Sequence, residues 1–309
     1  MLRSSLRWVA LLLLLTRSLV WAAPDEEQNR KAFADAEAAA KKGPDDIELS
    51  GQAVLRLPAG RVFVPQPQAT RLLNAMGNPG NDPRLQGLIF PEGNDNWFMT
   101  VRYDASGYVK DDDAREWNAD DLLKSYREGT EASNEERVKL GVPAIEIIGW
   151  AEKPAYDGAS HRLVWAMSSR DKGSPANAPQ GVNYNTYALG REGYFSLNLV
   201  TALNDLPQHK GAAHQLLDGL EYKDGKRYAD FNEKTDHVAE YGLAALVVGV
   251  AAKKLGLIAL AAAFFAKFAK VILLALALLG GGLFKFLRKR KAATTTHAAA
   301  AAAQEPPQA

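Results

Sequence analysis

The stretch VNYNTYALGREGYFSLNLV, residues 182–200, decides the fold class of this chain. It contains two strand-like runs, residues 182–189 and 193–200, separated by a short connection that includes Gly190 and Arg191. Aromatic and β-branched side chains recur in both runs, and the glycines mark a turn between them. Two strands joined so closely are expected to pair antiparallel.

Further strand-like and helix-like runs extend this pattern in both directions. Strands are predicted at residues 88–90, 97–103, 144–152 and 162–169, and helices at 27–42, 68–76, 118–139 and 206–219. Helices spaced along a mostly antiparallel sheet predict an α+β fold, with flanking helices, over residues 23–236. Two hairpins are predicted in addition, one around Pro58-Ala59-Gly60 and one around Asp224-Gly225.

The first 22 residues have the pattern of a signal peptide. Arg3 and Arg7 precede an apolar core, and the small residues Val20 and Ala22 allow cleavage before Ala23. An uncleaved N-terminal anchor is the alternative, although the apolar run is short for a membrane span.

A second membrane signal lies near the C-terminus. Residues 268–288 are almost wholly apolar and would form about 30 Å of helix, which matches a bilayer core. The basic residues around this segment are predicted to anchor it at the membrane interfaces. They are Lys267, Lys270, Lys285, Arg288, Lys289 and Arg290.

The basic flank also predicts the orientation of the chain. Positive charge favours the cytoplasmic side, so we expect residues 289–309 to form a basic, low-complexity cytoplasmic tail. The signal peptide would place the main domain in the periplasm. The expected location is therefore the bacterial inner membrane, with a single transmembrane helix at 268–288 in contact with the lipid bilayer.

Residues 237–267 are predicted to form an apolar juxtamembrane helix. Small residues recur there at four-residue spacing, at Ala245 and Gly249 and again at Ala259 and Ala263. Such spacing allows helices to approach closely, so self-association is one interpretation. The alternative is that alanine is simply a good helix former.

Composition excludes several function classes. Residues 23–240 carry 25 basic and 35 acidic side chains, whereas residues 241–309 carry nine basic and one acidic. An acidic body argues against nucleic-acid binding, because phosphate contacts need clustered Lys and Arg. The chain has no cysteine, which excludes a thiol nucleophile, a disulfide and a thiolate metal site.

No catalytic, cofactor-binding or metal-binding residues are predicted. His209 and His214 are five residues apart, unlike the paired histidines of a zinc helix. Asp157, Ser160 and His161 lie too close in sequence to converge as a triad. The acidic run 111–113 lacks the alternate spacing and central glycine of an EF-hand calcium loop. We therefore expect no cofactor, and an enzyme is the less favoured interpretation.

A set of tyrosines and arginines suggests a partner-binding surface instead. Tyr and Arg are enriched at protein-recognition hot spots. The candidate residues are Tyr184, Tyr187, Arg191, Tyr194, Arg227 and Tyr228. Ordinary packing of the tyrosines within the sheet is the alternative.

Four long motifs carry a resemblance to a known family. They are FPEGNDNWF, VKDDDAREWNADDLL, GVNYNTYALGREGYFSLNL and GKRYADFNEKTDHVAEYGLAAL. Over residues 28–291 the chain resembles a family of bacterial membrane-anchored proteins known only as a domain of unknown function. The resemblance implies a periplasmic domain and a C-terminal membrane helix, and it implies no catalytic residues. More loosely, the order of elements is similar to the Mog1/PsbP-like α/β/α sandwich, a likeness of fold that says nothing of function.

These observations favour a non-enzymatic binding or scaffold module of the cell envelope, with an unidentified envelope protein as partner. Two alternatives stay open. One is a membrane-anchored hydrolase that uses Asp, Glu and His side chains from distant positions. The other is an oligomeric membrane element.

Overall fold

The computed structural model describes residues 26–115 and 117–248. The helices are α1 (Glu26–Ala39), α2 (Gln68–Ala75), α3 (Ala119–Lys139), α4 (Leu206–Asp218) and α5 (Leu243–Val248). The strands are β1 (Lys41–Lys42), β2 (Asp45–Leu49), β3 (Ala53–Leu57), β4 (Arg61–Pro65), β5 (Leu85–Pro91), β6 (Phe98–Asp104), β7 (Ile145–Asp157), β8 (Arg162–Asp171), β9 (Gly181–Leu189), β10 (Tyr194–Ala202) and β11 (Leu220–Tyr222). Short 3-10 helices are η1 (Asp112–Arg115), η2 (Leu203–Asp205) and η3 (Tyr228–Asp230).

A large antiparallel sheet organises this part of the chain. Its eight strands lie in the order β1-β4-β5-β6-β10-β9-β8-β7, and each adjacent pair is antiparallel. The stretch 182–200 supplies β9 and β10, which pair from Tyr194 opposite Leu189 to Ala202 opposite Gly181. A second sheet has the order β11-β3-β2. The prediction of an α+β fold with a mostly antiparallel sheet and flanking helices is confirmed.

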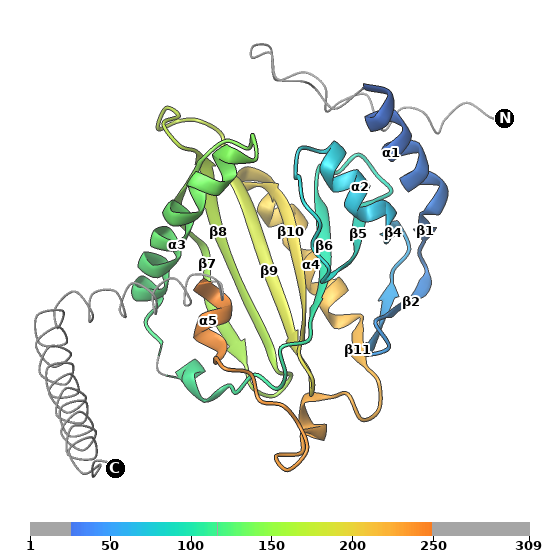
Figure 1. Ribbon diagram of the computed structural model, residues 1–309, viewed down its shortest axis with the longest axis vertical. Helices are drawn as coiled ribbons and strands as arrows, with labels where there is room; N and C mark the ends of the chain where they lie inside the picture. Colours follow the sequence, from blue (N-terminus) through green and yellow to red (C-terminus); the bar gives the residue numbers. More distant parts are fainter. Residues whose placement is uncertain (1–25, 116, 249–309) are drawn as a thin grey trace, which may run out of the picture. The chain divides into compact units, whose positions relative to one another are not determined.

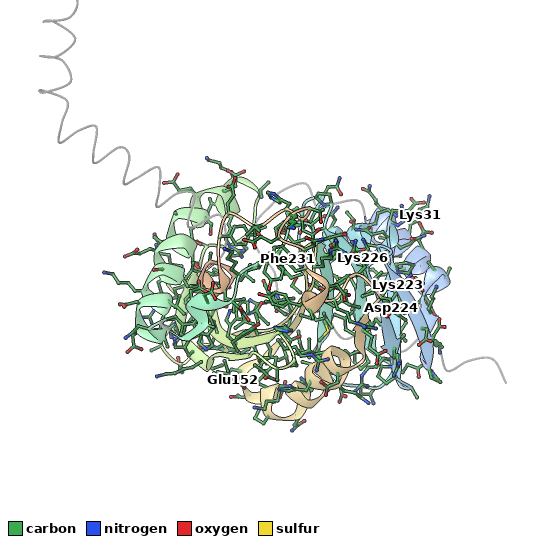
Figure 2. The ribbon with its side chains drawn as sticks, turned by 90° about the horizontal axis from the view of Figure 1, so that it is seen from below. Lys31, Glu152, Lys223, Asp224, Lys226 and Phe231 are labelled. Atoms are coloured by element: carbon green, nitrogen blue, oxygen red, sulfur yellow. The ribbon has the colours of Figure 1, made fainter. Side chains whose placement is uncertain are left out.

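One face of the large sheet, which we call the back face, is apolar along the central strands. Leu197 and Leu199 of β10 are fully buried and belong to one cluster with Leu216 of α4 and Leu55 of β3. Helix α4 crosses behind β9 and β10 (Figure 1). The small sheet and α4 together therefore cover the back face. Charged side chains point outward, among them Lys31, Glu152 and Asp224 (Figure 2).

The opposite, front face is covered at its two ends and not at its centre. At one end, α1 and α2 pack over β4 and β5, with Leu72 and Leu88 in a shared cluster. At the other end, α3 and α5 pack near β7 and β8, where Leu122, Trp165 and Leu243 share a cluster. Between these groups of helices, β6, β10 and β9 have no helix in front of them (Figure 1).

The prediction of a hairpin around Pro58-Ala59-Gly60 is wrong. The turn at Pro58-Ala59-Gly60 does not pair the strands on either side of it, since β3 pairs with β2 and β11 while β4 pairs with β5 and β1. The hairpin that forms instead turns at Ser50 and Gly51, both with positive φ. Gly60, at φ 76°, carries the chain from the small sheet to the large one.

The second predicted hairpin is also wrong. Asp224-Gly225 does form a turn, in which the Lys226 N–H donates to the Lys223 carbonyl over 3.0 Å. The chain beyond it does not return along β11, which pairs with β3. It pairs with the β9–β10 turn instead, through an isolated bridge between Gly190 and Arg227. Burial of the Tyr228 ring draws this segment toward the front face.

The predicted juxtamembrane helix begins later than expected. Residues 237–242 are not helical, and Val238 forms a parallel bridge with Tyr108. Helix α5 begins at Leu243, whose N–H donates to the Asp113 carboxylate over 3.0 Å, and the Ala244 N–H does so over 3.1 Å. A carboxylate there satisfies free N–H groups of the first turn and complements the helix dipole.

The start of α5 is thus part of the globular domain. Leu243, Leu246 and Val247 are buried beside α3. Ala245 is only 5% exposed, so in this structure it does not lie on a free self-association face. Gly249, Ala259 and Ala263 lie outside the described residues.

Most of the membrane predictions fall outside the part of the chain that the structure describes. The signal peptide (1–22), the transmembrane helix (268–288), its basic anchors and the tail (289–309) belong to this group. Within residues 26–115 and 117–248, no helix combines the length and the apolar character needed to cross a bilayer.

Replacing Leu197 with alanine should strongly destabilise the protein. Its side chain is fully buried between the central strands and α4, and Leu→Ala changes at such sites lower the free energy of unfolding by about 2–5 kcal/mol. Urea unfolding of the full-length protein, followed by tryptophan fluorescence, measures this change. Leu140→Ala is the matched control, because Leu140 is 55% exposed, and should cost less than about 0.5 kcal/mol. Equal losses would contradict the burial of Leu197.

Candidate functional site

The predicted tyrosine and arginine surface does not form as an exposed patch. Tyr184, Tyr194 and Tyr228 are 0%, 5% and 6% exposed, so the prediction is wrong for these three side chains. Tyr184 lies in the back-face cluster, whereas Tyr194 and Tyr228 lie in the front-face cluster with the half-buried Tyr187. Packing within the sheet, the alternative interpretation, accounts for the tyrosines because large aromatic rings gain most from burial.

The two arginines of that set serve local structure. Arg191 forms a two-pronged ion pair with Asp236, with Nε to Oδ2 at 2.6 Å and Nη2 to Oδ1 at 2.8 Å. These hydrogen bonds, together with the Asn232 N–H, hold the pKa of Asp236 well below its ordinary value. Arg227 is exposed and pairs with Asp224, three residues earlier. The Arg191 pair fastens residues 232–236 to the β9–β10 turn.

The front face contains a cavity, lined by both polar and apolar side chains, between the two groups of helices. It has a volume of about 590 Å³, within the range of small-molecule sites. We call it the central groove. Its floor is formed by strands β6, β10 and β9, and its rim by α2 and the loop of residues 76–84. The lining side chains used below are Leu73, Asn81, Asp82, Arg84, Phe98, Thr100, Arg102, Asn183, Asn198 and Val200.

Strand alternation brings the polar floor together. Successive side chains of a strand point to opposite faces, so in β10 the residues flanking Leu197 and Leu199 face the front. Asn198 is directly opposite Thr100 of β6 and Asn185 of β9. The polar residues at alternate positions of the central strands were the signal in the sequence that could have revealed the groove. The groove was not predicted because the sequence does not distinguish polar residues that face open solvent from polar residues that line a cavity.

The amide side chains of the floor are only partly satisfied. Asn198 Nδ2 donates to Asn183 Oδ1 over 3.3 Å, and Asn185 Nδ2 donates to the Asn183 carbonyl over 3.2 Å. Asn198 Oδ1 is buried and has no hydrogen-bond partner among the described residues. An unsatisfied buried acceptor costs about 1–3 kcal/mol, so free energy would be recovered if the Asn198 amide turned to accept from a ligand donor in the groove.

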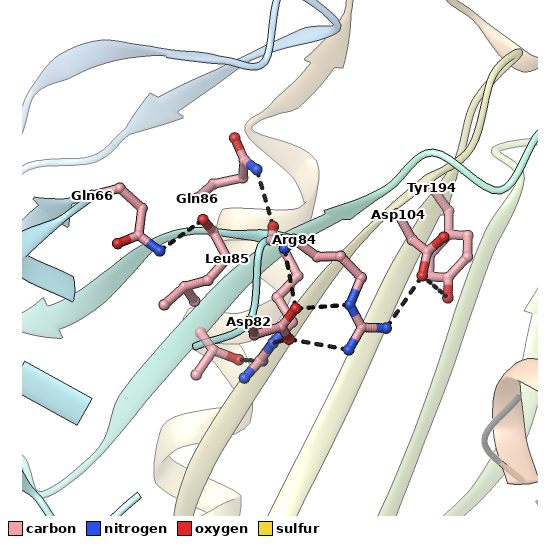
Figure 3. A network of polar contacts seen from close by, with 9 residues as sticks. Gln66, Asp82, Arg84, Leu85, Gln86, Asp104 and Tyr194 are labelled. Carbon is pink, nitrogen blue, oxygen red and sulfur yellow. Dashed lines mark hydrogen bonds and ion pairs between the residues drawn. The ribbon is translucent and has the colours of Figure 1, made fainter. Parts of the chain in front are cut away.

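Two arginines and two carboxylates form a closed network at one side of the groove (Figure 3). Asp82 accepts from Arg84 Nε at 2.9 Å and Nη2 at 3.0 Å, and from Arg102 Nε at 3.0 Å. Arg84 Nη1 also donates to Asp104 Oδ2 at 3.2 Å. Arg102 donates in addition to the hydroxyl of Thr100. Two positive and two negative groups leave this network without net charge.

The network fixes the charge state of Asp82. Burial raises the pKa of this carboxyl, but hydrogen bonds from the side chain and backbone of Arg84, with the charges of Arg84 and Arg102, outweigh it and hold the pKa below its ordinary value of 3.8. The same contacts raise the pKa of Arg84. The loop of residues 76–84 is thereby tied to strand β6.

Among the described residues, the histidines lie outside the groove lining, and His161, His209 and His214 make structural hydrogen bonds. His161 Nδ1 lies 3.1 Å from the Tyr156 hydroxyl, whereas the Ser160 hydroxyl donates to Asp157 over 2.6 Å, so these residues are not arranged as a triad. His209 contacts Thr201 over 2.7 Å. Across the described ranges no three His, Asp or Glu side chains gather in a way that could hold a metal ion. The side chains that line the groove can form hydrogen bonds with a ligand.

Replacing Asp82 with asparagine should loosen the loop of residues 76–84. The change removes the charge that holds Arg84 and Arg102, so we expect a lower melting temperature and faster proteolysis within this loop at neutral pH. Because the pKa of Asp82 is lowered on folding, its stabilising effect is present above about pH 3.8 and is lost as the pH falls through the lowered value. The difference between the two proteins should therefore shrink as the pH falls.

Asp95→Asn is the control for this experiment. Asp95 is an exposed carboxylate in the loop before β6, and no ion pair involves it within the described part of the chain. Its replacement should leave the melting temperature unchanged at every pH. A pH-independent loss for Asp82→Asn would contradict the ionic origin of the link.

Comparison with known proteins places the chain in a family. A search of curated proteins finds no match. Among solved structures, the chain is similar to the solution structure of cyanobacterial PsbP (CyanoP) from Synechocystis sp. PCC 6803, at 11% identity, over 68% of this chain and 99% of that one, with a TM-score of 0.36. No conclusion rests on a likeness at that score, and the PsbP-like sandwich stays a prediction. Residues 41–277 match the model of DUF2167, described as a protein of unknown function. Since this match spans more than half of the sequence, the chain belongs to the DUF2167 family.

Proposed function

We propose that this protein is a non-enzymatic binding module of the bacterial cell envelope that holds a polar ligand in its central groove. The observation that carries the proposal is the floor of the groove, where Asn198 lies beside Asn183 and Thr100 and its buried amide oxygen has no partner among residues 26–115 and 117–248. Buried polar groups are almost always hydrogen-bonded, so an exception inside a cavity indicates a place for a ligand.

The surroundings of the groove favour binding over catalysis. The two arginines nearest to the floor are held by carboxylates, and none of the four histidines in the described part of the chain lines the cavity. A rigid floor of three hydrogen-bonded strands keeps the side chains in place, which reduces the entropy lost on binding. The groove is thus built to recognise a ligand rather than to transform one.

The sequence supports a location at the periplasmic face of the inner membrane. A signal-peptide pattern precedes the domain, and the apolar segment 268–288 with its basic flank follows it. Helix α5 is packed into the domain, so only a short stretch separates the folded body from that segment. The ligand or partner would therefore be a component of the envelope close to the membrane.

Photo-crosslinking in cells tests the binding site. A photoreactive residue in place of Asn81, which is exposed at the rim of the groove, should crosslink to an envelope component. The same residue in place of Gln208, exposed on α4 behind the sheet, is the control and should not. Equal crosslinking at both positions, or none at Asn81, would remove the groove as the binding site.

Reporter fusions test the orientation. Alkaline phosphatase, which is active only after export, should be active when fused after Val248 and inactive when fused after Lys291. The reason is the positive flank of the apolar segment, which favours the cytoplasmic side. Activity after Lys291 would place the C-terminus outside the cytoplasm and contradict the proposed topology.

A further inference from the structure

The chemistry of the central groove narrows the class of ligand, provided that the proposed binding function holds. The charge of the groove limits which ligands it can bind. Arg84 and Arg102 both donate to Asp82, and Arg84 also donates to Asp104. An anion would have to break these pairs, and a cation would have to displace the arginines from the carboxylates. Arg84 is half exposed and could lose its partner at little cost, but the side chains of Asp82, Asp104 and Arg102 are only 22–27% exposed, and each of these charges would be left partly buried without a partner, which is costly. The groove is therefore suited to a neutral ligand.

The polar groups of the floor both donate and accept hydrogen bonds. An asparagine amide offers two N–H donors and a carbonyl acceptor, and a threonine hydroxyl offers one donor and two acceptor positions. Thr100 is directly opposite Asn198, Asn183 lies diagonal to Asn198 on the next strand, and Asn81 adds a further amide at the rim. A ligand with several hydroxyl groups, each able to donate and accept, would match this mixture. Because Asn198 Oδ1 is closed to solvent, the Asn198 amide would have to turn toward the groove to accept from such a hydroxyl.

Apolar side chains complete the lining. Phe98 is half-buried, with its ring stacked on Phe90 at 6.1 Å between centroids, and Val200 lies directly opposite it on β10. Leu73 of α2 faces them from the rim. Such a surface suits the C–H face of a sugar ring, whose hydroxyl rim would reach the amides.

The backbone of the floor argues against an extended peptide as ligand. Peptides commonly bind to a sheet by adding a strand at a free edge. Strands β6, β10 and β9 are central, and their backbone groups are engaged in ladders on both sides. Recognition in the groove must therefore use side chains. We infer that the central groove binds a neutral oligosaccharide, through the amides of Asn183 and Asn198 and the apolar face of Phe98.

Calorimetry on the full-length protein tests the inference directly. The protein is held in a detergent without a sugar headgroup, because a maltoside could itself occupy the groove. The probes are cellotetraose and N,N′,N″-triacetylchitotriose, both neutral, with inorganic phosphate and the capped peptide Ala-Ala-Ala as competing classes. We expect saturable binding of at least one oligosaccharide, with an affinity that does not change between about 0.05 and 0.5 M salt, because no net charge is involved.

Matched variants locate the binding. Asn198→Ala should weaken the oligosaccharide affinity about tenfold, through the loss of hydrogen bonds in the floor. Asn81→Ala changes an exposed rim residue that cannot disturb the core, and it should weaken binding by a smaller factor even if Asn198→Ala fails to fold. Asn204→Ala, exposed in η2 outside the groove, is the control and should bind like the natural protein.

Three results would overturn the inference. They are oligosaccharide binding that is unaffected by Asn198→Ala and Asn81→Ala, preferential binding of phosphate that weakens with salt, and binding of the peptide alone. If no oligosaccharide binds while the crosslinker at Asn81 still captures an envelope component, the ligand class is wrong and the binding function stands. If no oligosaccharide binds and the crosslinker at Asn81 captures nothing, both the ligand class and the binding function are wrong.

Discussion

The alternation of side chains in the three central strands is the constraint on which the rest of the structure depends. In β10, Leu197 and Leu199 point to one face of the sheet, and Ser196 and Asn198 point to the other. The apolar face can be stable only if it is covered, and α4 with the small sheet covers it. The polar face cannot take an apolar helix without burying amides that have no partners, so the front helices divide and pack at the two ends.

This division creates the central groove and also determines its character. Because the strands beneath are hydrogen-bonded on both sides, the floor is rigid and its amides are held at fixed spacing. The loop of residues 76–84 closes one side, fastened by Asp82 to Arg84 and Arg102. Burying charges in a partly dry site is tolerable only when they are paired, and this pairing leaves the groove polar without net charge.

Much of the element content was predictable from local pattern. Asn118 caps α3 as expected, accepting from the N–H groups of Asp120 and Asp121, because a helix start depends on neighbouring residues alone. The two hairpin predictions were wrong because a turn sequence determines where the chain bends, but it does not determine which strands pair with each other. After Gly60 the chain pairs with β5 and β1, and after Gly225 it bridges to the β9–β10 turn, because apolar surfaces elsewhere in the chain compete for each segment. The tyrosines were misplaced because both faces of the sheet are covered where they lie: Tyr184 packs in the back-face cluster, and Tyr187 and Tyr194 pack in the front-face cluster with Leu243 of α5.

The sequence by itself determined the fold class and the expected flanking signals for export and membrane anchoring, since these depend on composition and on short-range periodicity, and four long motifs carried the resemblance to the family. Tertiary structure alone decided which sheet each early strand joins, that α5 packs into the domain, and that Asn183, Asn198 and Thr100 meet on one floor. The physical reason is that a binding site is a convergence of side chains from separate strands. Register and layer packing bring those side chains together, and both are set by contacts between residues far apart along the chain.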